Sequence, residues 1–336
     1  MSAAVSEPQK RCLPVLSNSE IRTFRRCARE WKYSYKMLRR PLRDSEAQRF
    51  GTLIHLGLDA WWKTAGDAIS RYEASLSVLR AVEADEYDLI RTEELMLGYS
   101  ARWGSEAYET VGVEVEFTVP LVNPDTNQSS RTFQLGGKLD AIAIAPDGRK
   151  VVIEHKSTAS DLGLGSDYWR RVSALDSQIS QYMSCARASG FEAEACVYDV
   201  IRKVALRPLK ATPVESRKFT AKGLLYANQR EQDETPEDYR LRVRESIAGN
   251  PEKFYARGEV VRLEGDADDH AYDTWQFGKL MRDAEMSDRY PKNVDSCIRF
   301  NSECAFFDVC SGQASIDDDT RFRTAARVHE ELKEIA

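Results

Sequence analysis

The feature that most constrains this chain is a pair of short apolar segments joined by a three-residue turn, Pro146-Asp147-Gly148. The flanking segments, QLGGKLDAIAI and RKVVIEHKS, are rich in Val and Ile, as strands are. The tripeptide suits a type I turn followed by a residue in the left-handed conformation, a common three-residue hairpin loop. We therefore predict a β-hairpin in which Gly148 has positive φ and Ala145 pairs with Arg149.

The predicted register gathers charged side chains at one end of the hairpin. Asp140 falls opposite Glu154, and side-chain alternation puts Lys156 on the face of Glu154 and His155 on the other. Two neighbouring carboxylates repel each other unless a cation lies between them, and hard oxygen ligands suit Mg²⁺ or Mn²⁺. Such a metal lowers the pKa of bound water, and a lysine can stabilise charge that develops on a phosphate. The hairpin therefore predicts a metal-dependent hydrolytic site, although a solvent-facing charged pair on an edge hairpin is an open alternative.

Two helical motifs lie on either side of the hairpin in the sequence. Gly51 and His55 are one helical turn apart in FGTLIHLGLDAWW, so the missing side chain at Gly51 would let His55 approach the sheet. Gln178 and Tyr182 also share a helix face and offer an amide and a phenol to a nucleotide. Taken alone, His55 would more readily be a core histidine, and the second pair could be a solvated helix face.

The seven cysteines of the chain do not suggest a disulfide framework. Four of them are divided between the two ends of the sequence: Cys27, Cys297, Cys304 and Cys310. Zinc and an iron–sulfur cluster both accept four thiolates. The close C-x2-C pairs of zinc ribbons do not occur, and Phe306 and Phe307 could shield the site, which favours a cluster. Cys185 and Cys196 are expected to be small core residues, and Cys12 belongs to no group.

The charge distribution is strongly uneven. A net charge of −6 argues against a nucleic-acid partner, but the segment from Arg22 to Arg43 is basic and adjoins the first grouped cysteine. We expect one helix there, beginning at Ser17 or Ser19 and ending before Pro41. Its basic side chains are candidate contacts to a DNA backbone: Arg22, Arg25, Arg26 and Arg29. Of its aromatic residues, Trp31 is expected in the core.

Together these motifs resemble the PD-(D/E)XK nuclease superfamily, in its RecB-like branch, which includes the CRISPR-associated exonucleases. GGKLD before VVIEHKS is similar to the signature, G-x3-H precedes it, and Q-x3-Y follows it. The resemblance implies metal ligation by His55, Asp140, Glu154 and the carbonyl of His155, with Lys156 catalytic. It also implies DNA contacts by Gln178 and Tyr182, and a [4Fe–4S] cluster on the four grouped cysteines. Leu139 replaces the proline of the name, the His155 ring has no assigned role, and Glu116 is a possible extra acid near the metal.

The expected fold is an α/β core, a mixed central sheet flanked by helices as in restriction endonucleases, with helical insertions and the cysteine staple. Five regions are expected: 1–50, a basic helical segment; 51–215, the nuclease core; 216–290, a helical insertion or cap; 291–312, the cluster segment; and 313–336, a helix or tail. No apolar run reaches membrane-spanning length and no secretory signal is evident, so a cytoplasmic protein is expected.

The predicted activity is that of a metal-dependent DNA exonuclease. Its substrate would be single-stranded DNA or DNA ends, in recombination, repair, or CRISPR or phage DNA processing. Two alternatives are a non-catalytic DNA-end binding module that keeps the cluster and a sequence-specific endonuclease. The sequence does not indicate protein partners.

Overall fold

A computed structural model describes residues 13–163, 165–299 and 302–332. Its strands are β1 (Val15–Leu16), β2 (Arg39–Pro41), β3 (Glu109–Val122), β4 (Ser129–Ile144), β5 (Lys150–Thr158), β6 (Ala195–Arg202), β7 (Tyr255–Val260), β8 (Ile298–Arg299), β9 (Ser302–Glu303) and β10 (Phe322–Thr324). Its α-helices are α1 (Asn18–Arg26), α2 (Ala28–Trp31), α3 (Glu46–Lys63), α4 (Ala68–Arg80), α5 (Glu86–Trp103), α6 (Asp167–Leu175), α7 (Ser177–Ala188), α8 (Pro236–Gly249), α9 (Glu264–Ser287) and α10 (Phe307–Ser311). A π-helical turn, Lys32–Lys36, follows α2.

The central sheet is mixed, as the sequence predicts. Its order is β1-β4-β5-β6-β7, with β3 also paired to β4. The pairs β3–β4, β4–β5 and β6–β7 are antiparallel, whereas β1–β4 and β5–β6 are parallel. The parallel pair β5–β6 requires a crossover, which α6 and α7 supply.

The hairpin register is confirmed. Ala145 N–H donates to Arg149 O at 2.8 Å, and Gly148 has φ +87°. The ladder then runs from Ile144 opposite Lys150 to Ala141 opposite Ile153. This pairing fixes where each side chain of the hairpin points.

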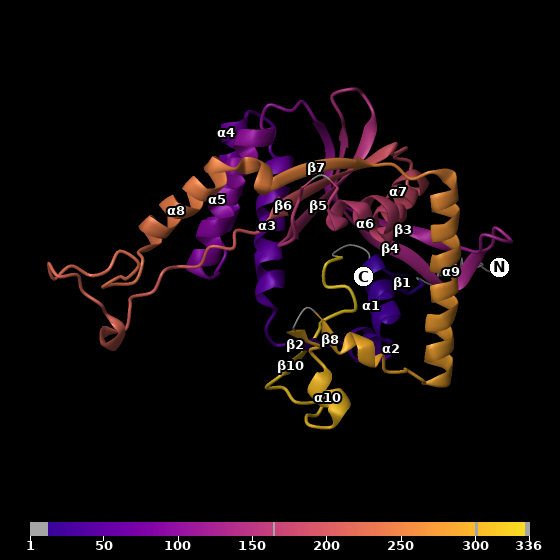
Figure 1. The fold of residues 1–336 in the computed structure, drawn as a ribbon. Coiled ribbons are helices and arrows are strands. Elements are labelled where there is room, and N and C mark those ends of the chain that lie inside the picture. Colours follow the sequence, from indigo (N-terminus) through magenta and orange to yellow (C-terminus); the bar gives the residue numbers. More distant parts are fainter. Residues whose placement is uncertain (1–12, 164, 300–301, 333–336) are drawn as a thin grey trace, which may run out of the picture.

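Two hydrophobic clusters give the molecule three layers (Figure 1). On one face of the sheet Ile153 packs with α3, α5 and α8, and on the other face Val152 packs with α6 and α7. Both side chains are fully buried, which stabilises the fold by roughly 1.5–3 kcal/mol each. A third cluster around Trp31 joins α1 and α2 to α9, and Trp31 is fully buried, as expected.

The basic N-terminal helix is not continuous. Ser17 caps α1 by accepting from Glu20 N–H at 3.2 Å, as predicted, but the helix ends at Cys27. Cys27 is extended, with φ −163° and ψ 114°, and α2 starts directly after it. The prediction of one helix to Pro41 was therefore wrong, because tertiary contacts of Cys27 override helix propensity. The helical segment after the hairpin is likewise divided, into α6 and α7, at the extended residue Asp176.

Strands from different predicted regions pair with one another in the structure. The segment 216–290, expected as a helical insertion or cap, contains α8 and α9 but also β7, which extends the central sheet beside β6. Residues 13–16 likewise supply β1 to the sheet, and β10 from the last region pairs with β2. The expected regions 1–50 and 313–336 also include residues 1–12 and 333–336, among them Cys12, which lie outside the described residues.

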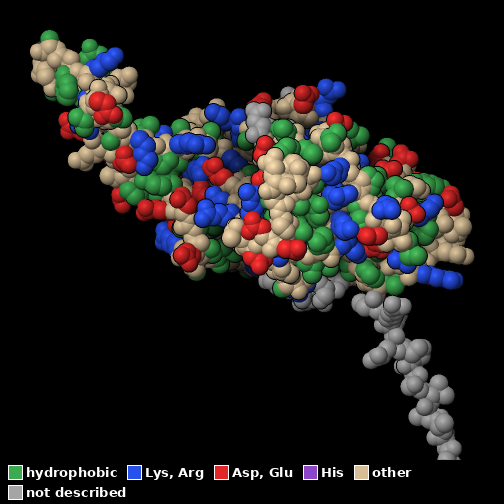
Figure 2. Space-filling view, turned by 90° about the horizontal axis from the view of Figure 1, so that it is seen from below, with side chains coloured by type: hydrophobic (Ala, Val, Ile, Leu, Met, Phe, Trp, Pro, Cys, Tyr) green, Lys and Arg blue, Asp and Glu red, His purple; other side chains and the backbone are tan. Residues whose placement is uncertain are grey.

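Between β6 and α8 the chain leaves the body as an arm (Figures 1 and 2). The arm turns back at Gly223, where Thr220 N–H donates to Leu224 O at 2.7 Å. Within the described ranges, no helix has both the length and the apolar character needed to cross a membrane.

Candidate active site

The two strands of the hairpin separate where the acidic residues begin. Beyond the last ladder pair, Ala141 opposite Ile153, the Asp140 carboxylate accepts a hydrogen bond from His155 N–H at 2.8 Å. On the neighbouring strand β3, Glu114 has φ +53°, an unusual conformation for a non-glycine residue. Leu139 packs in the cluster of α7 but Ala141 in the cluster of α3, so β4 changes face across Asp140. The site therefore lies at a break in the sheet that both helical layers can reach.

Glu154 is buried and incompletely paired. It is 1 % exposed; one carboxylate oxygen accepts from Lys156 Nζ, and the other, Oε2, has no hydrogen-bond partner among the described residues. Burial raises the pKa of Glu154 to about 7, with Asp140 adding to the rise and Lys156 opposing it. A buried polar atom without a partner is costly, and a cation would satisfy it.

His55 reaches the same point from α3. Its Nδ1 lies 3.6 Å from Asp140 Oδ1, too far for a hydrogen bond and close enough for both to bind one ion. Burial lowers the pKa of His55, but Asp140 outweighs this and the pKa is raised. Burial would raise the pKa of Asp140, but His55 outweighs it and the pKa is lowered. A Cβ at Gly51 would meet Ser157 Oγ at 3.4 Å, an ordinary contact, so the glycine allows but does not by itself create this approach.

The second motif meets the hairpin from α7. Lys156 Nζ donates to Gln178 Oε1 at 3.1 Å, and Gln178 Nε2 donates to Tyr182 Oη at 3.0 Å. Burial lowers the pKa of Lys156, but the charges of Glu154 and Asp140 raise it by more. The net shift is therefore upward, and the ammonium stays charged. Asp176 holds the start of α7 by accepting from Gln178 N–H. The structure thus brings together Asp140, Glu154, Lys156, His55, Gln178 and Tyr182.

These donors fit a hard divalent cation. Two carboxylates and one imidazole lie at this end of the hairpin, and among the described residues Glu154 Oε2 has no hydrogen-bond donor. In the described parts of the chain, no three His, Cys, Asp or Glu side chains are already arranged around one point as a metal-ion site.

His155 points to the opposite face of the sheet from Glu154 and Lys156, as alternation predicts, and the centroid of its ring lies 6.4 Å from that of the His55 ring. Its ring lies on the α3 face, 5.8 Å from the Trp62 ring centroid, and is 1 % exposed. Its Nδ1 lies 3.1 Å from Asp199 Oδ2. The two atoms are close, but they are not aligned as in a hydrogen bond. The ring is therefore part of the buried interior.

A basic cleft adjoins Lys156. It has a volume of about 660 Å³. Of the described residues that line it, Asp176 alone is acidic. The cationic residues that line it are Arg22, Arg25, Arg26, Lys156, Arg171 and Arg299. Tyr168 and Tyr198 line it as well. Three of the four predicted arginines therefore gather here, beside the hairpin.

Arg29 lies elsewhere. Its Nε donates to Tyr290 O at 2.9 Å, so it ties α2 to the residues after α9. Tyr33 packs against the Phe306 ring at 5.2 Å between centroids. These two side chains hold the N-terminal segment to the rest of the chain.

Several residues around the site were missed in the sequence. No sequence motif pointed to Arg171 or Arg299, although Arg299 follows Cys297 by two residues. Glu116 was singled out as a possible extra acid, but Glu114 is the residue opposite Asp140, where it accepts from Lys138 and Lys63. Alternation could not distinguish them because β3 is irregular at Glu114.

The four grouped cysteines line one small cavity. Phe306 and Phe307 share its lining. Burial raises the pKa of Cys304 to about 11, so its deprotonation requires a cation nearby. Asn293 Nδ2 and Ser296 Oγ both donate to Arg26 O, at 2.8 and 2.7 Å, which ties the late segment to the early one. Four thiols in one apolar-walled cavity are a donor set that fits an iron–sulfur cluster or zinc.

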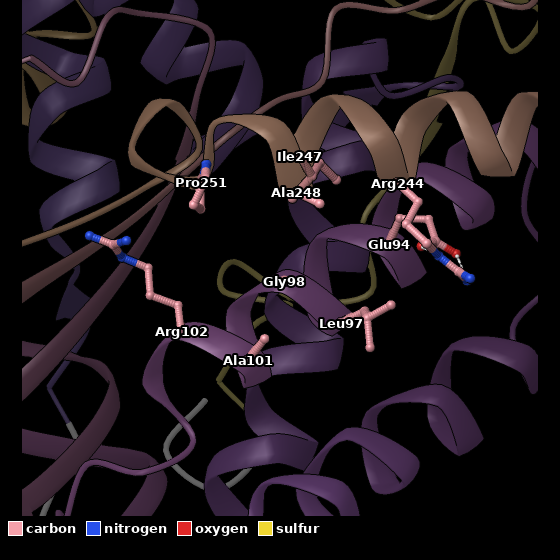
Figure 3. Close-up of a pocket in the computed structure, with 9 residues that line it drawn as sticks. All are labelled: Glu94, Leu97, Gly98, Ala101, Arg102, Arg244, Ile247, Ala248 and Pro251. Carbon is pink, nitrogen blue, oxygen red and sulfur yellow. Dashed lines mark hydrogen bonds and ion pairs between the residues drawn. The ribbon is translucent and has the colours of Figure 1, made fainter.

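A separate cavity of about 440 Å³ lies between α5 and α8 (Figure 3). Its lining is mostly aliphatic, and its charged side chains are paired, Arg244 with Glu94 and Arg102 with Glu252. Nothing in it resembles a reactive group, so we assign no chemistry to it.

Comparisons with known proteins give one family and several solved structures. The profile of the PD-(D/E)XK nuclease superfamily matches residues 15–311. No curated protein matches the chain. Among crystal structures, a candidate exonuclease from Eubacterium rectale is 10% identical with a TM-score of 0.45, covering 89% of this chain and 93% of that one.

Two further crystal structures are more distant. A phage-related exonuclease from Haemophilus somnus 129PT is 12% identical with a TM-score of 0.31, covering 70% of this chain and 94% of that one. The protein SSO0001 is 17% identical with a TM-score of 0.28, covering 71% and 78%. The family profile spans both the hairpin and the grouped cysteines. The chain belongs to the PD-(D/E)XK nuclease superfamily.

Proposed function

We propose that this nuclease is a metal-dependent DNA exonuclease of the RecB-like branch, acting in the cytoplasm on single-stranded DNA ends. The observation that carries the proposal is the buried, unpartnered Oε2 of Glu154 beside Asp140, His55 and Lys156. Most buried carboxylate oxygens in proteins are paired. One that lacks a partner beside a second carboxylate, an imidazole and a lysine has the character of a metal ligand.

Each residue at the site has a proposed task. Asp140, Glu154, His55 and the carbonyl of His155 would hold Mg²⁺ or Mn²⁺, which when bound supplies Lewis acidity and lowers the pKa of water. Lys156, charged and held by Gln178, is positioned to stabilise negative charge developing on the scissile phosphate. Gln178 and Tyr182 would position the nucleotide from the α7 side.

The basic cleft favours a nucleic-acid substrate despite the acidic net charge. Its cations lie next to Lys156, and each phosphate that they neutralise releases counterions and strengthens binding. Tyr168 and Tyr198 give the cleft aromatic faces on which unpaired bases could stack, which favours a single strand. Recombination, repair, and CRISPR or phage DNA processing are the settings in which such an activity is used.

The direct test is cleavage of end-labelled DNA with and without Mg²⁺ or Mn²⁺. We expect metal-dependent release from the labelled end, and a loss of about 10²–10³-fold in kcat for Lys156→Ala, as for other groups that stabilise transition-state charge. Glu154→Ala should lose activity as well. Lys203→Ala, a cation beyond β6, is the matched control and should retain activity. Wild-type rates in Glu154→Ala would disprove the site, and DNA binding without any turnover would favour a non-catalytic end-binding protein.

We further propose that Cys27, Cys297, Cys304 and Cys310 hold a [4Fe–4S] cluster with a structural role. The support is their shared cavity, its phenylalanine wall, and the hydrogen bonds that tie residues 293–296 to Arg26. A bound cluster would stabilise these ties because thiolate–metal sites contribute folding free energy.

The cluster is tested by metal analysis. Protein purified without oxygen should be brown and contain about four irons per chain. Cys27→Ser should bleach it and lower Tm, whereas Cys185→Ser, a buried cysteine of the core, should keep the iron. Zinc without iron would replace the cluster by a zinc site, and a metal-free protein insensitive to Cys27→Ser would remove both.

A further inference from the structure

The proposed active site adjoins a large space on one side and a much smaller one on the other. On the Lys156 side lies the basic cleft of about 660 Å³. On the Asp140 side the remaining space is about 130 Å³, between Asp140 and Tyr182 on one wall and Glu331 and Leu332 on another. The first residues of α1 complete this small chamber.

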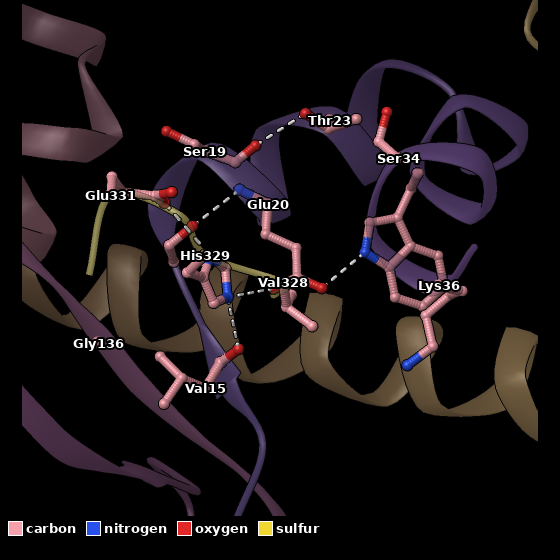
Figure 4. Close-up of polar contacts among 12 residues, drawn as sticks. Val15, Ser19, Glu20, Thr23, Ser34, Lys36, Gly136, Val328, His329 and Glu331 are labelled. Carbon is pink, nitrogen blue, oxygen red and sulfur yellow. Dashed lines mark hydrogen bonds and ion pairs between the residues drawn. The ribbon is translucent and has the colours of Figure 1, made fainter. Parts of the chain in front are cut away.

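The wall formed by residues 329–332 is firmly anchored (Figure 4). His329 is 2 % exposed, and its Nε2 lies 3.1 Å from both the carbonyl oxygen of Val15 and Oε2 of Glu20. Its Nδ1 lies 3.3 Å from Glu331 Oε1. Glu20 is itself buried and accepts from Trp31 Nε1 at 2.8 Å. The segment is therefore clamped to α1 and, through Trp31, to the third hydrophobic cluster.

Electrostatics strengthen this clamp at neutral pH. Burial lowers the pKa of His329, but its contacts with Glu20 and Glu331 raise it to about 10. The imidazolium is therefore charged and paired under ordinary conditions. The preceding residues are also held, because β10 pairs with β2 and Ala325 N–H donates to Leu38 O at 2.7 Å.

We propose that residues 329–332 are a stop that admits only the end of a strand to the cleavage site. The proposal rests on the nuclease function proposed above. A strand cut internally must leave the site on both sides of the reacting phosphate. Space of about 130 Å³ is well below the roughly 300–1,000 Å³ of pockets that enclose a small molecule. The chamber can take the terminal group of a strand, and a continuing chain would collide with Glu331 and Leu332.

The test compares linear and closed circular single-stranded DNA of one sequence, with Mg²⁺ or Mn²⁺ present. Wild type should digest the linear strand and spare the circle. Glu331→Gly with Leu332→Gly removes the wall and one contact of His329, and leaves the contacts of His329 with Val15 and Glu20 in place; we expect circle cleavage to rise by about tenfold or more. Glu330→Gly is the matched control, because Glu330 pairs with Arg323 and does not line the chamber, and it should still spare the circle.

A second variant tests the anchor instead of the wall. His329→Gln should loosen the same segment and also allow circle cleavage, with proteolysis near residue 329 as an independent readout. If wild type cuts linear ends but both variants still spare circles, residues 329–332 do not act as a stop, and the proposed nuclease function is unaffected. If wild type cuts circles as fast as linear strands, or cuts neither, the stop fails together with the exonuclease proposal.

Discussion

Glu154 and Asp199 are both 1 % exposed and lie on neighbouring strands, yet their surroundings differ completely. Asp199, on the α3 face, accepts from Arg257 Nε at 2.9 Å and from Tyr99 Oη at 2.5 Å. Burial would raise the pKa of Asp199, but Arg257 outweighs it and the pKa is lowered. Glu154, on the α7 face, has an oxygen without a hydrogen-bond partner among the described residues and a raised pKa. Burial alone therefore does not separate the two carboxylates, whereas their pairing does.

The largest expected difference between the two is in stability. Asp199→Ala leaves Arg257 buried without its main partner, so we expect a loss of about 3–5 kcal/mol in the free energy of unfolding. Glu154→Ala should cost less without metal, because it removes a carboxylate that burial disfavours and leaves Asp140 and Gln178 beside Lys156. Urea denaturation in EDTA measures both, with Asp161→Ala, an exposed carboxylate, as control. Equal losses at Glu154 and Asp199 would remove the distinction.

The second difference concerns pH. Glu154 has a folded pKa of about 7, above its usual 4.5, so the folded state binds more protons than the unfolded one in this window. Its ionisation therefore costs stability as pH rises from about 4.5 to 7. Glu154→Gln should be more stable than wild type at pH 8 by on the order of 1–3 kcal/mol, and not at pH 4.5. Melting curves in EDTA give the result.

Asp199 should behave in the opposite way. Its lowered pKa contributes stability that is present above the usual aspartate range and is lost only as pH falls below it. The difference between wild type and Asp199→Asn should therefore stay constant from pH 5 to 8. A constant difference for Glu154→Gln as well would show that burial does not shift its pKa.

The smallest effect concerns the cleft on the Glu154 side of the sheet. Arg171→Gln and Arg299→Gln should each weaken single-stranded DNA binding and reduce the slope of log K against log salt by about 0.7. Binding is measured with the Glu154→Ala protein so that no DNA is cut. Lys253→Gln carries the same charge change outside the cleft and should leave the slope unchanged. An unaltered slope in all three would place the strand elsewhere.

The parts of this molecule that local chemistry determines were predictable. A three-residue turn sets the hairpin register, and alternation then separates His155 from Glu154 and Lys156. Helix spacing correctly put Gln178 beside Tyr182, because residues four apart share a helix face.

What depends on distant contacts was not predictable. The break at Cys27 arises where residues 293–296 bond to the carbonyl of Arg26. Strand β7 was missed because YARGEV carries the charged residues Arg257 and Glu259. Arg257 is nevertheless largely buried, and its guanidinium donates a hydrogen bond to Asp199 on the neighbouring strand. Arg299 enters the cleft because the fold returns the chain there, which no local pattern encodes.

The attachment of α1 also has a consequence for synthesis of the chain. Its neighbours Val15, Arg26 and Arg29 bond to His329, Asn293 and Tyr290, all more than 260 residues later. A ribosome makes these partners last, and such distant contacts form late because closing the loop costs entropy. A nascent chain can therefore form the hairpin with its acidic residues long before α1 is fastened over it. The arginines of α1 reach their final place only when synthesis is nearly complete, so an unfinished chain has the proposed catalytic residues without the proposed DNA-binding arginines.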